Sequence, residues 1–169
     1  PLHSEFSAKE QRLIFDPPPP GKRKVVLATN IAEASITIPD VTVVIDTGRV
    51  REMRYDGQKR LAVLEETWVS RASSTQRAGR AGRTQPGVAF RLYSKRLHEL
   101  LFKAQTTPEI RRVALEDLVL QIELLQLGKA EAFLAKAVTP PKPAAVAAAV
   151  LNLSELGAVE PDGRGGRDR

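Results

Sequence analysis

Arginine and glycine alternate in one short segment, residues 76–83, whose sequence is QRAGRAGR. Arg80 and Arg83 are three residues apart, which predicts that both side chains share one face of a short helix over residues 73–83 that the glycines interrupt. Guanidinium groups stay charged and present their donors in a plane, so they suit a triphosphate better than lysine does. The segment indicates a phosphate-binding element. The alternative is a loosely structured basic helix on the surface.

A second segment, residues 28–38 with sequence ATNIAEASITI, carries small polar side chains. It begins where a strand over residues 24–29 is predicted to end, and open parallel sheets bind their ligands at that edge. Hydroxyl and amide groups are offered by Thr29, Asn30, Ser35 and Thr37. The alternative is an ordinary connection between a strand and a helix, with threonine and asparagine as caps.

Charge is distributed unevenly along the chain. Residues 71–96 contain seven basic residues and no acidic one, and residues 49–60 contain five basic residues against two acidic ones, whereas the net charge of the whole chain is +6. A solvated surface usually mixes both signs, so a long segment of one sign is a candidate phosphate-binding surface. A basic surface without a ligand remains the alternative.

Length and composition exclude several classes of protein. A chain of 169 residues can form one medium domain or two small ones. It has no cysteine and two histidines, which excludes a disulfide scaffold, a cysteine nucleophile and a histidine-built metal centre. The longest apolar run, residues 144–151, is too short to cross a membrane. Because Pro1 stands in place of a methionine, we expect a segment of a longer protein. The compartment stays open between the cytoplasm and the nucleus.

The first hundred residues predict an α/β domain. Ser7 and Glu10 have the spacing of a capping box, so a helix is expected over residues 7–15, ended by Asp16 and four prolines. Strands are expected over residues 24–29, 41–46 and 87–92, with a short helical turn between the first two. Their continuous apolar character predicts parallel strands that are covered on both faces.

Two further features complete the predicted organisation. Asp56-Gly57 between strand-like residues 49–55 and 59–67 predicts a polar, basic hairpin that protrudes. After a boundary near residues 102–105, a helix capped by Thr106 or Thr107 is expected to run to Gly128 with an apolar face of Ile110, Val113, Leu118, Ile122 and Leu125. A second helix follows the prolines of residues 140–143 and ends at Gly157, with an apolar face of Val146, Val150, Leu153 and Leu156. The Gly/Arg-rich residues 162–169 are expected to be disordered.

In order and spacing, these segments resemble the C-terminal part of the helicase core of the DEAH/RHA family, the superfamily 2 ATP-dependent RNA helicases. Residues 1–4 with 11–15 resemble its motif IV region, residues 29–38 its motif V and residues 76–83 its motif VI. The sequence FRLY at residues 90–93 continues the resemblance, and TPEIRR at residues 107–112 resembles the start of the winged-helix module of this family. The resemblance covers about residues 1–160.

The resemblance implies a RecA-like parallel sheet with flanking helices, followed by a small, mainly helical, winged-helix-like module. Residues 1–103 would form the second RecA-like domain without its first elements, residues 104–160 a partial winged-helix module, and residues 161–169 a disordered tail.

The resemblance also implies a role for each matching residue at the nucleotide. The family's catalytic positions correspond to Gln76, Arg80 and Arg83, which would face the β- and γ-phosphates of ATP, with the two arginines as arginine fingers. Phe15 would stack on the adenine, although it could simply be the core residue that closes the first helix. Ser35 and Thr37 would sense the state of the nucleotide.

RNA would be held through its backbone rather than read through its bases. The positions that the resemblance assigns to this contact are the backbone at Ser4, the side chains of Thr29 and Asn30, and Arg51 on the hairpin. The hairpin itself would act as a wedge or a guide for the strand.

Some parts of the family pattern are absent from the sequence. It contains no G-x-x-x-x-G-K-[ST] motif, no acidic DEAH box and no Ser-Ala-Thr motif. Ala34 replaces a usual threonine, and Pro39 stands where many members carry an acidic residue. We therefore expect ATP and Mg²⁺ to require a first RecA-like domain of the same parent chain, which would hold the metal, and the isolated chain to lack ATPase activity.

Three functions remain open at this stage. The first is a part of a 3′–5′ RNA helicase. Its partners would be single-stranded RNA, the first RecA-like domain and a G-patch-type activator, and we expect it to bind no membrane. The second is a non-catalytic adaptor, derived from a helicase half, that binds RNA or a helicase. The third is a plain basic RNA-binding domain, whose binding would be mainly electrostatic and insensitive to Thr29 and Asn30.

Overall fold

The computed structural model describes residues 1–3, 6–34, 36–57 and 61–159, and the predicted disorder of residues 162–169 therefore lies outside the described residues. The chain divides into two compact units. The N-terminal unit comprises Pro1–Glu52 and Glu66–Thr106, and the C-terminal unit comprises Met53–Glu65 and Thr107–Arg169. Each unit is described by itself below.

The first helix is fixed by its own capping residues. Helix α1 (Ala8–Arg12) begins after Ser7, whose backbone N–H donates to Oε2 of Glu10 (2.9 Å), while the Glu10 N–H donates to the Ser7 hydroxyl (3.4 Å). The 3₁₀ turn η1 (Leu13–Phe15) follows and ends at Asp16. The predicted capping box and the predicted end of the helical segment are confirmed.

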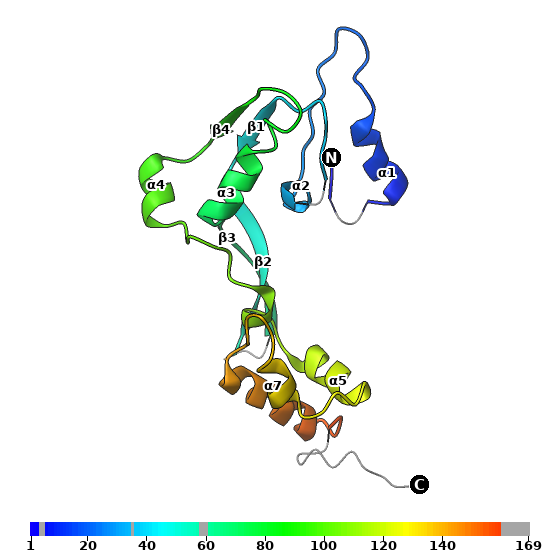
Figure 1. Ribbon diagram of the computed structural model, residues 1–169, viewed down its shortest axis with the longest axis vertical. Coiled ribbons are helices and arrows are strands. Elements are labelled where there is room, and N and C mark those ends of the chain that lie inside the picture. Colours follow the sequence, from blue (N-terminus) through cyan, green and yellow to red (C-terminus); the bar gives the residue numbers. More distant parts are fainter. Residues whose placement is uncertain (4–5, 35, 58–60, 160–169) are drawn as a thin grey trace. The chain divides into compact units, whose positions relative to one another are not determined.

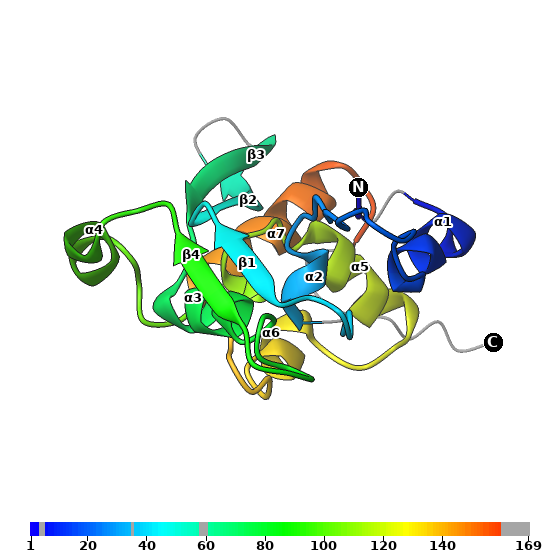
Figure 2. The same cartoon turned by 90° about the horizontal axis from the view of Figure 1, so that it is seen from above.

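The N-terminal unit is built on a parallel pair of strands. Strand β1 (Val43–Asp46) pairs with β4 (Val88–Arg91) in parallel, with Val43 opposite Val88 and Asp46 opposite Arg91. Figure 2 shows the two strands side by side. Helix α3 (Arg71–Ala78) contacts both strands and the short helix α2 (Ile31–Ala34). The predicted α/β class, with parallel strands and flanking helices, is confirmed.

The predicted strand over residues 24–29 is wrong. With the described residues this segment forms a single parallel bridge, between Leu2 and Ala28, in which the Leu2 N–H donates to the Leu27 carbonyl (2.7 Å) and the Thr29 N–H to the Leu2 carbonyl (3.1 Å). A strand needs a neighbour along its length, and within the described part of the chain Leu2 alone supplies one. Val25 is accordingly 77% exposed.

The expectation that the strands are covered on both faces is also wrong. Val43, Ile45, Val88 and Phe90 are all at least half exposed, whereas Asp46 is buried. Side chains alternate between the faces of a strand. Since α3 packs against these strands, the face that carries Asp46 is covered, and the described residues leave the other face open.

Helix α3 is shorter than predicted. Its C-cap is Gly79, whose N–H donates to the carbonyl of Thr75 (3.0 Å). The next N–H groups, of Arg80 and Ala81, bond to carbonyls only three residues earlier, at 3.1 and 3.2 Å, which tightens the chain into a turn. Arg80 and Arg83 therefore lie beyond the helix, and the prediction that they share a helix face is wrong.

A hairpin and a short helix complete the N-terminal part of the chain. Strands β2 (Arg49–Asp56) and β3 (Leu61–Trp68) form a two-stranded sheet, which confirms the predicted hairpin. Residues 49–52 and 66–68 belong to the N-terminal unit, and residues 53–65 to the C-terminal unit. Helix α4 (Lys95–Leu100) starts at Ser94, whose hydroxyl accepts the Leu97 N–H (3.2 Å).

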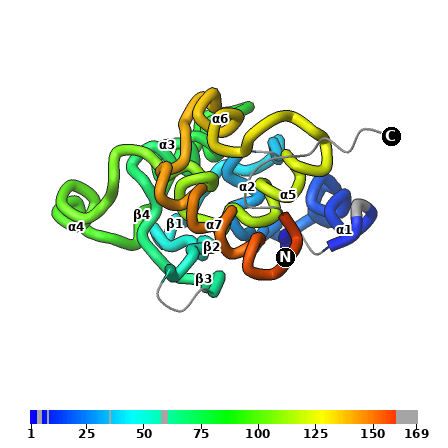
Figure 3. Tube along the Cα trace, turned by 90° about the horizontal axis from the view of Figure 1, so that it is seen from below, coloured from blue at the N-terminus to red at the C-terminus, as the bar shows by residue number. Residues whose placement is uncertain are grey.

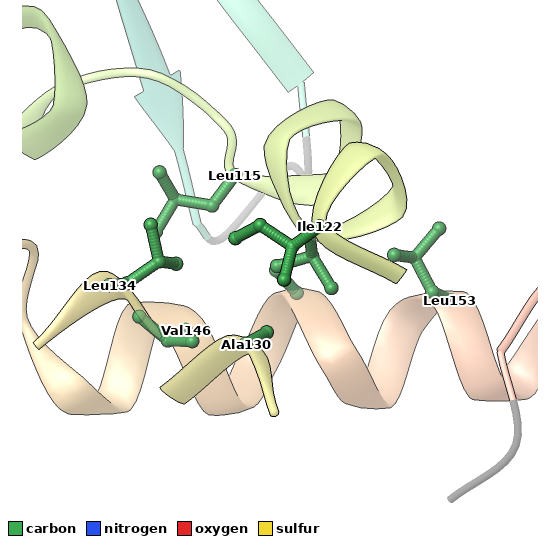
Figure 4. Packing of buried hydrophobic residues seen from close by; sticks show 8 residues of the cluster. Leu115, Ile122, Ala130, Leu134, Val146 and Leu153 are labelled. Atoms are coloured by element: carbon green, nitrogen blue, oxygen red, sulfur yellow. The ribbon is translucent and has the colours of Figure 1, made fainter. Parts of the chain in front are cut away.

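Three helices form the core of the C-terminal unit: α5 (Glu116–Leu124), α6 (Ala130–Leu134) and α7 (Pro143–Glu155). Figure 3 traces the chain through them in order. Their apolar faces meet in one cluster, shown in Figure 4, that consists of Leu115, Val119, Ile122, Ala130, Leu134, Val146, Ala149 and Leu153. Burial of a leucine or valine side chain is worth about 1.5–3 kcal/mol, so this cluster gives the unit a core of its own.

The predicted continuous helix from Thr106 to Gly128 is wrong. The structure has a 3₁₀ turn η2 (Glu109–Arg111), a break, and then α5. The break falls at Arg112, whose carbonyl accepts the N–H of Tyr55 (2.7 Å) and whose φ is −130°. That carbonyl would have to accept an N–H four residues later if the helix continued.

Two details at the ends of these helices also differ from the predictions. The predicted threonine cap is wrong, because the residue before η2 is Pro108 and Thr106 instead donates its hydroxyl hydrogen to Ser70 (3.0 Å). Helix α7 starts and stops as expected, with Gly157 at a φ of 71°. Leu156, expected on its buried face, is 79% exposed. The short helix α6 was not predicted.

Candidate nucleotide and nucleic-acid site

The turn that follows α3 carries the candidate phosphate-binding side chains. The start of α3 is fixed by Ser70, which is buried and whose hydroxyl oxygen accepts the Ser73 N–H (3.0 Å). Gln76 is exposed on the last turn of the helix, and Arg83 is exposed in the turn beyond it. Both side chains are therefore open to a ligand from solvent.

Arg80 is half-buried and reaches the other candidate segment. Its Nη1 donates to the carbonyl of Ile36 (3.3 Å), which lies directly before Thr37. Its Nε is buried and has no hydrogen-bond partner among the residues that the structure describes. A buried donor without an acceptor is costly, so this atom needs a further partner. The structure thus brings Arg80 to Ile36 of the second candidate segment, a contact that neither segment predicts on its own.

The polar residues before α2 expose their side chains. Thr29 and Asn30 use their backbone carbonyls to accept the N–H groups of Ala32 (3.3 Å) and Glu33 (2.9 Å). The Thr29 hydroxyl also accepts the Ile31 N–H at 3.5 Å, a long contact to the first residue of α2. The Asn30 amide and the Thr37 hydroxyl face solvent, free to contact a ligand.

The remaining predicted site residues are not brought to this turn by any hydrogen bond within the described ranges. Phe15 is 47% exposed while its neighbour Ile14 is buried, so the interpretation of Phe15 as a core residue is wrong. Arg51 is exposed on β2, in the N-terminal unit. Ser4 and Ser35 lie outside the described residues.

Arg77 is a central residue of this region that the sequence analysis missed. Its Nε donates to Oε2 of Glu33 (3.0 Å) and its Nη1 to Oδ1 of Asp46 (3.0 Å), with side-chain exposures of 15% for Arg77, 15% for Glu33 and 3% for Asp46. The same Nη1 donates to the carbonyl of Arg49 (3.1 Å). Removing one partner of such a buried ion pair leaves an uncompensated charge, at a cost of about 3–5 kcal/mol.

Asp46 is satisfied from several directions at the end of β1. Its Oδ1 also accepts the Gly48 N–H (2.9 Å), and its Oδ2 accepts the Tyr93 hydroxyl (3.0 Å), which lies 2.5 Å from the Ser74 hydroxyl. Burial raises the pKa of Tyr93 above its usual value, and the Ser74 hydrogen bond opposes that shift. One feature of the sequence could have pointed to Arg77. Asp46 ends a predicted strand, and the basic segment of residues 71–96 holds no acidic residue that could pair with Arg77.

The residues present fit a polyphosphate. The unpartnered Arg80 Nε, the exposed Arg83 guanidinium and the exposed Gln76 amide are hydrogen-bond donors in or beside one turn. Guanidinium donors pair well with phosphate oxygens.

A binding site for a divalent metal is not found among the described residues. Within these ranges, no group of three or more histidine, aspartate or glutamate side chains could hold such an ion. Nor does any described helix have the length and apolar character needed to cross a bilayer.

Several known proteins are similar to this chain in sequence, and one solved structure is similar to it in fold as well. The helicase conserved C-terminal domain matches residues 1–85. The DExH4 ATP-dependent RNA helicase of Arabidopsis thaliana chloroplasts is 49% identical over 162 residues, 96% of this chain and 11% of that protein. Human probable ATP-dependent RNA helicase DHX34 is 48% identical over 160 residues, 95% of this chain and 14% of that protein. The crystal structure of the E. coli DExH-box NTPase HrpB matches with a TM-score of 0.79 at 41% identity, over 94% of this chain and 19% of that one.

The chain therefore belongs to the helicase conserved C-terminal domain family, and within it to the DEAH/RHA group of superfamily 2 helicases. The resemblance to this group and the RecA-like α/β fold are confirmed. The chain spans 11% of the length of the Arabidopsis relative and 14% of the human one.

Proposed function

We propose that this chain is one part of a 3′–5′ RNA helicase that hydrolyses ATP between two RecA-like domains, of which this chain supplies the second. The longer protein that would contain both is called the parent protein below. The names of the relatives support the use of ATP and RNA. The observation that carries the proposal is the contact between Arg80 and Ile36, which joins the candidate nucleotide residues to the candidate RNA-binding segment.

In this proposal, Gln76, Arg80 and Arg83 hold the β- and γ-phosphates. Bound ATP supplies the phosphoanhydride bond whose hydrolysis drives the movement between domains. The arginines balance the negative charge that develops on the transferred phosphoryl group, and such arginine fingers contribute roughly 10³–10⁵ in rate. Phe15 packs on the adenine, and Ser35 and Thr37 respond to the nucleotide state. Mg²⁺ would be held by the first RecA-like domain.

RNA binding in this proposal uses exposed groups of the N-terminal unit. Thr29 and Asn30 donate to backbone phosphates, the backbone at Ser4 does the same, and Arg51 adds a positive charge on the hairpin. Such contacts position the strand without reading its sequence. Residues 104–160 would act as a partial winged-helix module, and a G-patch-type activator would be a further partner, in the cytoplasm or the nucleus.

The test is RNA-stimulated ATPase activity of the parent protein, of its Arg80→Ala variant and of the 169-residue chain alone. We expect activity in the parent protein, a loss of roughly 10³–10⁵ in the variant, and none in the isolated chain. Arg96→Ala is a matched control, because Arg96 is an exposed arginine of the same basic segment. RNA binding without ATPase activity in the parent protein would instead support the adaptor function.

A further inference from the structure

Arg77 joins three segments of the N-terminal unit, of which two lie beside proposed RNA contacts. It lies on α3, directly after Gln76, and its guanidinium group bonds to Glu33 of α2, to Asp46 of β1 and to the carbonyl of Arg49 at the start of β2. Figure 1 shows α2 beside α3, in agreement with the contacts between these helices. Glu33 follows Asn30 by three residues and Arg49 precedes Arg51 by two, so two of these partners are close in sequence to a residue proposed to touch RNA.

An unbroken series of hydrogen bonds runs from Asn30 to Arg80 through this side chain. The carbonyl of Asn30 accepts the backbone N–H of Glu33 (2.9 Å), and the carboxylate of Glu33 accepts Nε of Arg77 (3.0 Å). The carbonyl of Arg77 then accepts the backbone N–H of Arg80 (3.1 Å). The two ends are therefore connected by a contiguous series of bonded groups.

The position of the Arg77 guanidinium is fixed on its far side by Asp46. That carboxylate is only 3% exposed and also accepts hydrogen bonds from Gly48 and Tyr93, so it cannot follow a movement of Arg77 freely. Because Arg77 is held to β1, a shift of Glu33 must either break the ion pair or move the end of α3. Well-packed, fully bonded groups of this kind favour discrete arrangements over gradual deformation.

We propose that Arg77 is a positioning residue that couples RNA binding on residues 29–30 to ATP turnover at Gln76, Arg80 and Arg83. The inference rests on the proposed function. Arg77 itself touches neither RNA nor nucleotide in this role. It transmits a displacement between the two, which makes the coupling a property of the Glu33–Arg77 pair rather than of either site alone.

The test uses the parent protein with the variants Glu33→Gln and Arg77→Lys. Glu33→Gln removes the negative charge of the pair, and Arg77→Lys keeps the positive charge but lacks the planar fork that reaches Glu33 and Asp46 through separate nitrogens. Asp40→Asn is the control, since it removes an ion pair elsewhere in the same unit, between Asp40 and Lys24 (2.7 Å), whose side chains are 37% and 17% exposed. The quantities measured are kcat with and without an unstructured oligouridylate, the KM for ATP, the Kd for the RNA and the melting temperature.

We expect both bridge variants to lose at least about fivefold of the stimulation of kcat by RNA, the lower end of typical coupling factors. Basal kcat, the KM for ATP and the RNA Kd should change less than the stimulation does, because neither variant removes a group that touches a ligand, even where breaking the buried pair lowers the melting temperature. The control should keep full stimulation. A non-hydrolysable ATP analogue should also lose its effect on the RNA Kd in the variants, because coupling between binding sites is reciprocal.

Two results would overturn the inference, and they differ. The first result requires that the unaltered parent protein has RNA-stimulated ATPase activity. Arg77 is then only structural if both bridge variants retain the full stimulation. It is also only structural if they lose basal and stimulated activity by the same factor and their melting temperature falls. If the unaltered parent protein shows no stimulation by RNA, the proposed function and the coupling both fail.

Discussion

Gly87 lies so close to the carbonyl group of Ala81 that no Cβ atom fits between them. A Cβ at this position would collide with the Ala81 oxygen and lie 2.5 Å from the carbonyl oxygen of Thr42. The neighbouring Val88 N–H donates to the same Thr42 carbonyl (2.8 Å), and Ala81 is 2% exposed. The turn that carries the candidate arginines is therefore held directly against the backbone at the start of β1 and β4.

We predict that Gly87→Ala destabilises the chain by about 1–3 kcal/mol, because two backbone segments must move apart to admit the methyl group. The free energy of unfolding in urea measures this change. Gly82→Ala is the matched control, since a Cβ at Gly82 meets no atom within 4 Å although Gly82 lies in the same turn. Equal stability of the two variants would show that the packing around Gly87 is not tight.

Asn30 offers a test of specific RNA contact against general electrostatic attraction. We predict that Asn30→Ala in the parent protein weakens binding of single-stranded RNA by roughly 10–100-fold, the value of a hydrogen bond to a charged phosphate. The salt dependence of the Kd should barely change, since no charge is removed. Arg51→Ala removes the positive charge that is proposed to contact RNA, so it should instead reduce the slope of log K against log salt by up to about 0.7. An unchanged affinity in the Asn30 variant would favour the plain basic RNA-binding domain.

Tyr93 makes stability depend on alkaline pH. Its pKa is raised above 10.0 by burial, so its neutral hydroxyl is the form that the folded chain prefers. Stability from this group is fully present below the pKa of an unfolded tyrosine, and it is lost as pH rises through the higher pKa of the folded state. Urea unfolding of the chain on both sides of this range should show that loss, and Tyr93→Phe should remove it. Tyr55→Phe is the control, because the chain has only two tyrosines; the same loss in the Tyr93 variant would contradict the prediction.

Local signals in the sequence predicted local structure well. The Ser7–Glu10 capping box, the Asp56-Gly57 hairpin and the end of α7 at Gly157 all depend on residues that are neighbours along the chain. The interactions that stabilise such features are formed within a few residues, so their spacing is enough to identify them.

Two predictions failed because a residue distant in the sequence decides the local structure, although the predicted parallel pairing of β1 with β4 is confirmed. Residues 24–29 have the composition of a strand, but only Leu2 pairs with them among the described residues. The helix expected to continue through Arg112 stops there because the carbonyl of Arg112 accepts a hydrogen bond from Tyr55. No property of residues 106–128 alone indicates that Tyr55 is the competitor.

The sequence by itself determined the family, the α/β class and the two segments that carry the candidate site, because these depend on residue types in a fixed order. Only the tertiary structure placed Arg80 beside Ile36 and made Arg77 the link between Glu33 and Asp46. Arg80 and Ile36 are 44 residues apart in the sequence, as are Arg77 and Glu33, and Arg77 and Asp46 are 31 residues apart. Contacts of that range depend on how α2, α3 and β1 pack, since packing decides which charges are buried together and must neutralise one another.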